Sequence, residues 1–153
     1  MSAGQAMTDV EIRRIGAADD HLLANVAEDV FDAPIDVAFL AAYIAAPGHM
    51  MVLAVCAGQV IGQARGMVHL SPDQAPELYI DNMGVTPARL REGIGGRLLD
   101  ALGQWGHEAG CDYAWLGTEA DNIAAQALYE SRGGARSQMV MYEYDDGAGI
   151  ISQ

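Results

Sequence analysis

Three glycines within four positions, directly before a stretch of helical periodicity, constrain the fold of this chain most strongly. Residues 90–98 are LREGIGGRL, and apolar residues recur at helical spacing from Ile94 through Leu98 to Leu102. The alternating stretch ELYIDNMGV at residues 77–85 predicts a strand just before this loop. Glycine lets a ligand approach the backbone, and the first N–H groups of a helix lack internal partners. The sequence therefore predicts an anion site at the start of this helix.

The two best-known phosphate loops do not match these glycines. A Walker A loop requires G-K-[ST], but Gly96 is followed by Arg97 and Leu98. A dinucleotide fingerprint requires a third glycine where Leu98 stands. Arg89, Arg91 and Arg97 nevertheless lie close together in a chain of net charge −13 that contains no lysine. This local reversal of sign favours a phosphate-rich ligand, although a turn that only permits tight packing is the alternative.

Composition and charge limit the remaining possibilities. The 153 residues, 51% of them hydrophobic, predict a single domain over residues 1–153, with loose termini at 1–8 and 147–153. The acidic balance argues against nucleic acid and is compatible with a cationic substrate, or simply with solubility. The two cysteines and four histidines lack metal-ligand spacing, so no metal is expected. The start of the chain lacks the features of a signal peptide, and no apolar stretch could span a bilayer, so a cytoplasmic protein is expected.

The other elements follow from periodicity, capping residues and turn residues. We expect one helix to begin at Asp19-Asp20 and run to Val30, and a second to begin at Asp36 with Phe39, Leu40, Tyr43 and Ile44 on one side. The remaining expected elements are strands at 10–15, 50–56 and 60–68, a helix at 94–109, a strand at 113–118, a helix at 122–132 and a strand at 135–144. This order predicts an α/β or α+β domain in which helices pack against a mixed sheet.

Two motifs resemble those of the GNAT superfamily of N-acetyltransferases. VTPARLREGIGGRLLDAL at 85–102 is similar to its acyl-CoA signature, V-x-P-x-x-[QR]-x-x-G-x-G-[AG]-x-L-L, and departs from it at Leu90. TEADNIAAQALYESRGG at 118–134 is similar to a later segment, N-x-x-A-x-x-L-Y-x-x-x-G. The resemblance implies the GNAT fold, a mixed and mostly antiparallel central sheet flanked by helices.

By this resemblance the cosubstrate is acetyl-CoA. Residues 83–85 would pair with the pantetheine arm, residues 90–97 would hold the pyrophosphate, and Asn122 would contact the pantetheine. The expected cofactor-binding residues are Met83, Gly84, Val85, Leu90, Arg91, Glu92, Gly93, Ile94, Gly95, Gly96, Arg97, Asn122, Ala125 and Tyr129.

Direct transfer of an acetyl group to an amine needs a general acid and a general base, but no enzyme nucleophile. Tyr129 stands where the family places a tyrosine near the sulfur, so it is the expected acid. Alternation along residues 77–85 places Glu77, Tyr79 and Asp81 on one face, and Asp81 is the expected base, directly or through a water. A bulge in this strand would change that alternation.

The acceptor side resembles the aminoglycoside 3-N-acetyltransferase branch, which implies a polycationic antibiotic as substrate and a role in antibiotic resistance. The expected substrate-binding residues are Asp32, Asp36, Glu77, Tyr79, Asp81, Glu119 and Asp145, while Asp121 could line the same cleft or only cap a helix. Two alternatives remain: a GNAT enzyme that acts on a peptide or protein N-terminus, a lysine or a small metabolic amine, and a non-catalytic acyl-CoA-binding module. A homodimer is possible.

Overall fold

The computed structural model describes residues 9–147 and 149–151. Their contacts divide the chain into two compact units, Met1–Glu119 and Ala120–Gln153. The single domain expected over residues 1–153 stays a prediction. The loose termini expected at 1–8 and 147–153 fall largely outside the described residues.

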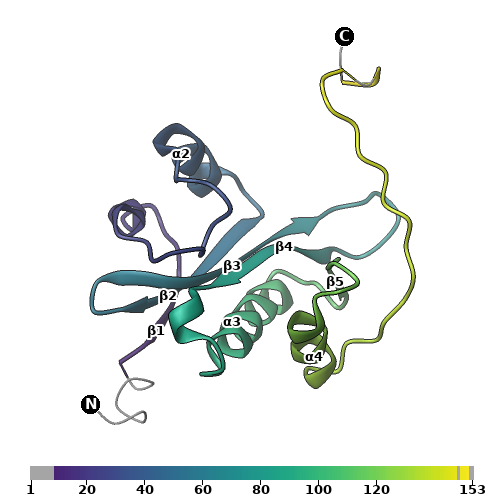
Figure 1. Cartoon of the computed structure of the whole chain (residues 1–153). Helices are drawn as coiled ribbons and strands as arrows, with labels where there is room; N and C mark the ends of the chain where they lie inside the picture. The colour runs from purple at the N-terminus through teal and green to yellow at the C-terminus, as the bar shows by residue number, and fades with distance from the viewer. Residues whose placement is uncertain (1–8, 148, 152–153) are drawn as a thin grey trace. The chain divides into compact units, whose positions relative to one another are not determined.

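A five-stranded sheet forms the centre of the first unit, with the strands in the order β1-β2-β3-β4-β5 (Figure 1). The strands are β1 (Glu11–Arg14), β2 (His49–Cys56), β3 (Gln59–His69), β4 (Glu77–Val85) and β5 (Ala114–Trp115). The first three pairings are antiparallel and the β4–β5 pairing is parallel. The expected fold class, a mixed and mostly antiparallel sheet flanked by helices, is therefore confirmed.

Helix α3 (Ile94–Glu108) packs along one face of this sheet (Figure 1). Ile94, Leu98 and Leu102 are fully buried there, as their spacing predicts. Glycines allow the helix to approach closely, because a Cβ at Gly106 would lie 2.9 Å from the Leu78 side chain. This packing holds the start of α3, and with it the glycine loop, beside the end of β4.

The opposite face is covered by the segment between β1 and β2. It contains a short 3-10 helix, η1 (Asp20–Ala24), and α2 (Val37–Ala45). The second core cluster lies under them and includes buried Leu23, Val30, Met51, Leu53 and Val60.

The helix expected from Asp19 to Val30 is wrong beyond Ala24. Val26 instead bridges Val60 in β3, and the Ala27 N–H donates to the Val60 carbonyl at 2.8 Å. Hydrogen bonding to the sheet replaces the helical bonds that these residues would otherwise make, so the chain leaves the helix at Asn25.

Asp19 does not cap this helix, contrary to the sequence-based expectation. Its carboxylate accepts from the Gly16 N–H at 2.8 Å and from Arg13 Nη2 at 2.6 Å. The hydrogen bond from Arg13 is the main reason that the Asp19 pKa lies below its usual value of 3.8. Asp19 therefore ties the turn after β1 to the strand itself.

Asp19→Asn should make stability less dependent on pH. A carboxyl whose pKa is lowered by folding contributes stability above its unfolded pKa, and this contribution is lost as pH falls through the folded value. We expect the wild-type protein to lose more unfolding free energy than Asp19→Asn between pH 7 and pH 3. Urea denaturation at both pH values measures this difference. The exposed neighbour Asp20→Asn is the matched control, and equal losses in wild type and Asp19→Asn would contradict the assignment.

The helix expected after Asp36 is confirmed as α2. The Asp36 side chain accepts from the Phe39 N–H at 2.9 Å, which makes it the N-cap. Tyr43 and Ile44 pack against the core, as does Leu40. Phe39 does not share that side, because its side chain is 76% exposed.

In the second unit, α4 (Ile123–Ser131) confirms the expected last helix. Its N-cap is Asn122, which accepts from the Ala125 N–H at 3.2 Å, so Asp121 is not the capping residue. Gly133 has a positive φ of 86° and ends the helix in the left-handed conformation typical of glycine.

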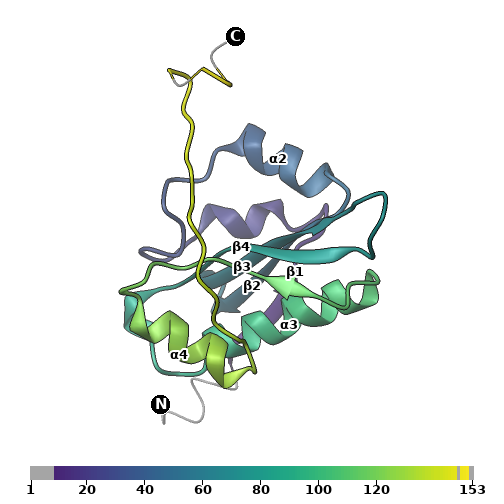
Figure 2. The ribbon, with the colours of Figure 1, turned by 90° about the vertical axis from the view of Figure 1, so that its right-hand side faces the viewer.

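One strand was predicted too long, and another that was predicted does not form. The strand expected at 113–118 is only the two-residue β5, and the strand expected at 135–144 does not form. Residues 134–145 are extended, without strand pairing among the described residues (Figure 2). Alternating polar and apolar residues make a sequence compatible with a strand, but a strand also requires a partner for its backbone.

Candidate functional site

The carboxyl end of β4 has one paired edge and one open edge. On one side, Met83 pairs with Ala64 and Val85 pairs with Gly62, both in β3. On the other side, pairing with β5 is limited to Leu78 and Tyr79. Among the described residues no strand continues along that edge beyond Tyr79. Backbone groups near Met83–Val85 can therefore bind an extended ligand arm as an added strand would bind.

The loop after β4 turns its backbone toward the start of α3. The Thr86 N–H donates to the Ile61 carbonyl at 2.9 Å, which fixes the beginning of the loop. A single 3-10 turn, η2 (Pro87–Arg89), follows, and then Arg91 and Gly93 have positive φ angles of 65° and 78°. The side chain at Arg91 makes that conformation strained, and such strain is typical of functional loops.

The N-terminus of α3 offers unpaired backbone donors. The first turn of the helix is closed by the Arg97 N–H, which donates to the Gly93 carbonyl at 3.2 Å. The N–H groups of residues 94–96 precede this bond and have no partner within the helix. With the helix dipole, they form a site suited to a phosphate.

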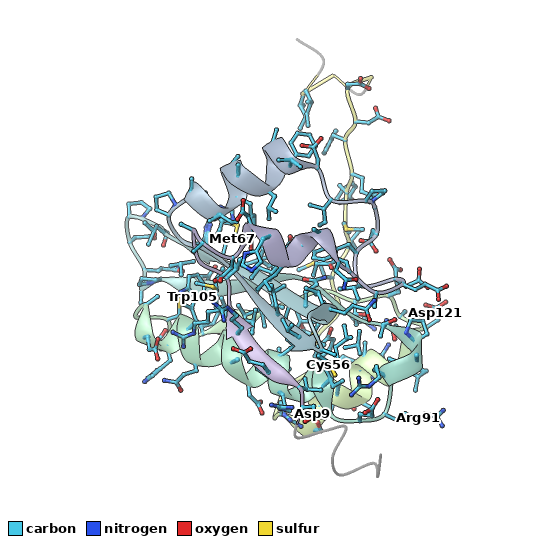
Figure 3. The ribbon with its side chains drawn as sticks, turned by 90° about the vertical axis from the view of Figure 1, so that its left-hand side faces the viewer. Asp9, Cys56, Met67, Arg91, Trp105 and Asp121 are labelled. Carbon is cyan, nitrogen blue, oxygen red and sulfur yellow. The ribbon has the colours of Figure 1, made fainter. Side chains whose placement is uncertain are left out.

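Two of the three nearby arginines serve the local structure. Arg89 Nε donates to Glu92 Oε2 at 2.7 Å, and this bond, together with the neighbouring Cys56 thiol, raises the Arg89 pKa. Arg97 Nη2 donates to the Val10 carbonyl at 3.1 Å. Arg91 is exposed and points away from the body of the protein (Figure 3). An anion at this loop would therefore be held mainly by backbone N–H groups.

The polar row expected along β4 is interrupted by a bulge. Leu78 and Ile80 are buried, as predicted. The β3–β4 register then shifts, so that Gly66 pairs with Ile80 and Arg65 with Asn82, and Asp81 has no direct counterpart. The Asp81 carboxylate accepts from Arg65 Nε at 3.1 Å, and half of its side chain is exposed. Asp81 is accessible, but one of its carboxylate oxygens is paired with the Arg65 guanidinium of β3.

Tyr79 belongs to this row, and Tyr43 of α2 lies near it. The ring of Tyr79 packs on Trp115 of β5, with centroids 4.4 Å apart. The Tyr43 hydroxyl is buried and has no hydrogen-bond partner among the described residues. Burial raises the Tyr43 pKa to about 12, while the charges of Arg65 and Asp81 act in opposite directions. Tyr43 is therefore a neutral hydroxyl near the ion pair at neutral pH.

The residues that join β4 to the loop at 28–36 were not predicted from the sequence. Gln63 Nε2 donates to the Val30 carbonyl at 3.2 Å and to Asn82 Oδ1 at 2.7 Å, and Asn82 Nδ2 donates to Asp32 Oδ2 at 3.4 Å. Gly84 completes this contact, since a Cβ there would lie 2.4 Å from the Val30 carbonyl oxygen. The available signal was a glutamine within the apolar strand at residues 60–68.

The other expected site residues are distributed over both units. Asp36 is occupied as the N-cap of α2, and Glu119 is exposed at the end of the first unit. In the second unit Asp145 accepts from the Gly147 N–H at 3.0 Å, and partial burial raises the Tyr129 pKa. Asn122 and Ala125 are joined by the N-cap bond of α4. The first unit thus contains Asp32, Glu77, Tyr79 and Asp81 around one strand.

Within residues 9–147 and 149–151, no cluster of three or more histidine, cysteine, aspartate or glutamate side chains is arranged to hold a metal ion. In the same part of the chain, none of the helices combines the length and apolar character needed to cross a membrane.

Solved structures of the same fold include aminoglycoside acetyltransferases. The enzyme meta-AAC0020 from an uncultured soil metagenomic sample, in complex with sisomicin, has a TM-score of 0.77 at 19% identity, covering 90% of this chain and 97% of that one. The aminoglycoside N-acetyltransferase AAC(6')-Iy in complex with CoA has a TM-score of 0.73 at 18% identity, covering 89% and 94%. At these identities the likeness establishes the fold alone.

The relatives found by sequence are much longer proteins, and the chain matches only a small part of them. A probable N-acetyltransferase HLS1-like of Arabidopsis thaliana is 36% identical over 56 residues, which are 37% of this chain and 14% of that protein. The pattern of the acetyltransferase (GNAT) family, in contrast, matches residues 19–134, most of the chain. With the open end of β4 and the glycine loop leading into α3, this match establishes that the chain belongs to the GNAT family of acetyltransferases.

Proposed function

We propose that this protein transfers the acetyl group of acetyl-CoA directly to an amine of an aminoglycoside. The observation that carries the proposal is the continuous path from the unpaired edge of Met83–Val85, through the loop at 86–93, to the N-terminus of α3. An extended arm fits the first part and a pyrophosphate fits the last. The pyrophosphate would be contacted by residues from Leu90 to Arg97, mostly through their backbone N–H groups.

The reaction exchanges a C–S bond for a C–N bond and involves three proton transfers. A substrate ammonium first loses a proton to Asp81, directly or through a water. The neutral nitrogen attacks the thioester carbonyl carbon, a C–N bond forms, and the C–S bond breaks. Tyr129 protonates the departing thiolate and regains a proton from the new amide nitrogen through solvent. A backbone N–H near Met83–Val85 polarises the carbonyl as an oxyanion site does.

Carboxylates support the choice of a polycationic acceptor. Asp32 and Asp81 both lie beside Asn82 on β4, and Glu77 lies on the same strand. The net charge of −13 attracts cations over a longer range. Several neighbours of the same fold are aminoglycoside acetyltransferases, one of them crystallised with sisomicin. Acetylation at the 3-amino group and a resistance role are parts of the proposal that rest on the family resemblance alone. A cytoplasmic location rests on the sequence features given above, and a homodimer is a possible assembly that no sequence feature requires.

Release of free thiol from acetyl-CoA tests the function directly. Purified protein should release thiol rapidly with gentamicin or sisomicin, and slowly with a peptide panel or without an acceptor. Mass spectrometry and NMR of the product then identify the acetylated nitrogen and separate 3-amino from 6'-amino transfer. Rapid release with peptides would favour the peptide or small-amine alternative. Acetyl-CoA binding without turnover on any amine would favour a non-catalytic acyl-CoA-binding module.

Asp81→Asn should lower kcat/KM about tenfold at neutral pH, less than the usual loss for a general base, because a water can replace the carboxylate. The loss should grow at lower pH, where more of the acceptor amine is protonated. Steady-state kinetics from pH 6 to pH 9 measure this dependence. Asp73→Asn, which removes the same charge from an exposed loop of the first unit, is the control. A pH profile identical to that of the wild type would exclude Asp81 as the base.

A further inference from the structure

Asn82 lies between the two parts of the proposed site, which are the acceptor side with Asp32 and the acetyl-CoA segment Met83–Val85. It follows the bulge in β4, immediately after Asp81 and immediately before the segment Met83–Val85. Its amide nitrogen donates to Asp32 Oδ2, and its amide oxygen accepts from Gln63 Nε2. A single side chain of β4, the strand that would bind the acetyl group, thus contacts both the loop that carries Asp32 and Gln63 of β3.

Gln63 is the fixed end of this arrangement. Its side chain is fully buried in β3, and its Nε2 donates both to Asn82 and to the Val30 carbonyl. Its Oε1 is buried and has no hydrogen-bond partner among the described residues. Burying an unpaired amide oxygen is costly, and an apolar residue of similar size would avoid that cost. A specific requirement for the two donated bonds accounts for a glutamine at this position.

The loop at 28–36 is attached at a second point. A Cβ at Gly84 would lie 2.4 Å from the Val30 carbonyl oxygen, so the loop backbone rests directly on the end of β4. Asp29 has a positive φ of 60°, which an aspartate tolerates better than most residues. Asp32 then lines an open hollow of about 280 Å³ formed by Val26, Ala27 and residues 31–35.

From these contacts we infer that Gln63 and Asn82 are positioning residues for the acceptor. The bond from Asn82 to Oδ2 orients the Asp32 carboxylate so that Oδ1 can accept a substrate ammonium in the adjoining hollow. Because the same asparagine belongs to β4, the distance between this ammonium and the acetyl group is set by the Gln63–Asn82–Asp32 chain. The inference rests on the proposed function and names the residues that determine its acceptor affinity.

Asn82→Ala should raise the KM for sisomicin about tenfold, while kcat and the Kd of acetyl-CoA change less than threefold. Asp32→Asn should raise KM by a similar factor. The KM of the double variant should be no higher than that of either single variant. Both changes act on the same carboxylate, because one removes its charge and the other removes its orientation. Asn25→Ala, which removes an exposed asparagine–carbonyl bond elsewhere in the first unit, is the matched control and should leave KM unchanged. Independent, multiplying effects of Asn82→Ala and Asp32→Asn would overturn the inference.

Two further variants separate orientation from charge and from folding. Asn82→Asp keeps the size but replaces the donor by a carboxylate that repels Asp32. Orientation by Asn82 predicts a higher KM, whereas a site that only collects negative charge predicts a lower one. Gln63→Leu removes the buried amide, and its KM should also rise when it is measured well below its Tm. A wild-type KM in Gln63→Leu would contradict the role of Gln63.

The same assays distinguish failure of the inference from failure of the proposed function. Wild-type protein that acetylates no aminoglycoside contradicts the proposed function, and the inference falls with it. Wild-type protein that is active, with Asn82→Ala and Asp32→Asn acting independently, leaves the function intact and removes only the inference.

Discussion

Gly95→Asp should greatly weaken the binding of acetyl-CoA while leaving the fold intact. Gly95 lies in the first turn of α3, where its half-buried position would bring a new carboxylate beside the proposed pyrophosphate site. Two unit charges about 5 Å apart repel by about 3 kcal/mol at an effective dielectric constant of about 20. This repulsion corresponds to a Kd raised by about 100-fold or more. Calorimetric titration with acetyl-CoA measures it.

The stability of Gly95→Asp should not fall together with its affinity for acetyl-CoA. A carboxylate in the first turn of a helix interacts favourably with the helix dipole, by about 0.3–1 kcal/mol. The unfolding free energy of Gly95→Asp should therefore equal or slightly exceed that of the wild type. Gly103→Asp places the same charge at an exposed position in the middle of the same helix, and it should leave the Kd nearly unchanged. Equal affinities for wild type and Gly95→Asp would place the pyrophosphate elsewhere.

Tyr129→Phe should lower kcat about 100-fold, within the usual range for the loss of a general acid. Partial burial raises the Tyr129 pKa, so the phenol carries its proton at neutral pH, as a proton donor to the thiolate must. The Kd of acetyl-CoA should change little, because only the leaving-group proton is affected. Single-turnover kinetics together with calorimetry separate these two quantities.

The pH dependence provides a second test of Tyr129. Wild-type activity should fall on the alkaline side as the phenol loses its proton above its raised pKa, and Tyr129→Phe should lack that limb. Tyr113→Phe, at an exposed tyrosine of the first unit, is the control and should keep the wild-type profile. If Tyr129→Phe retained the wild-type kcat, the proton would have to come from another group or from water.

Local patterns in the sequence predicted several elements correctly. Residues 77–85 form β4 with the expected bounds, and Asp36 and Gly133 act as the expected helix start and helix end. The glycines at 93–96 lie at the N-terminus of α3, as the helical spacing after them indicates. Each of these features depends on residues only a few positions apart, through capping, alternation or backbone freedom.

Local patterns failed where a distant residue competes for the same backbone or side chain. The helix expected to reach Val30 ends at Ala24 because Val26 and Ala27 bond to Val60 in β3. The strand expected at 135–144 does not form in the absence of a paired strand. In both cases the local propensity was real, but hydrogen bonding in the tertiary structure decided the outcome.

Motifs and short-range periodicity were enough to predict the family, the glycine loop and the candidate acids. Which of these acids can contact a ligand depends on the packing of segments that are distant in the sequence. This packing pairs Asp81 with Arg65 and brings Asp32 to Asn82. Asp32 and Asn82 are 50 positions apart in the sequence, so their contact depends on how β3, β4 and the loop at 28–36 pack rather than on any local pattern.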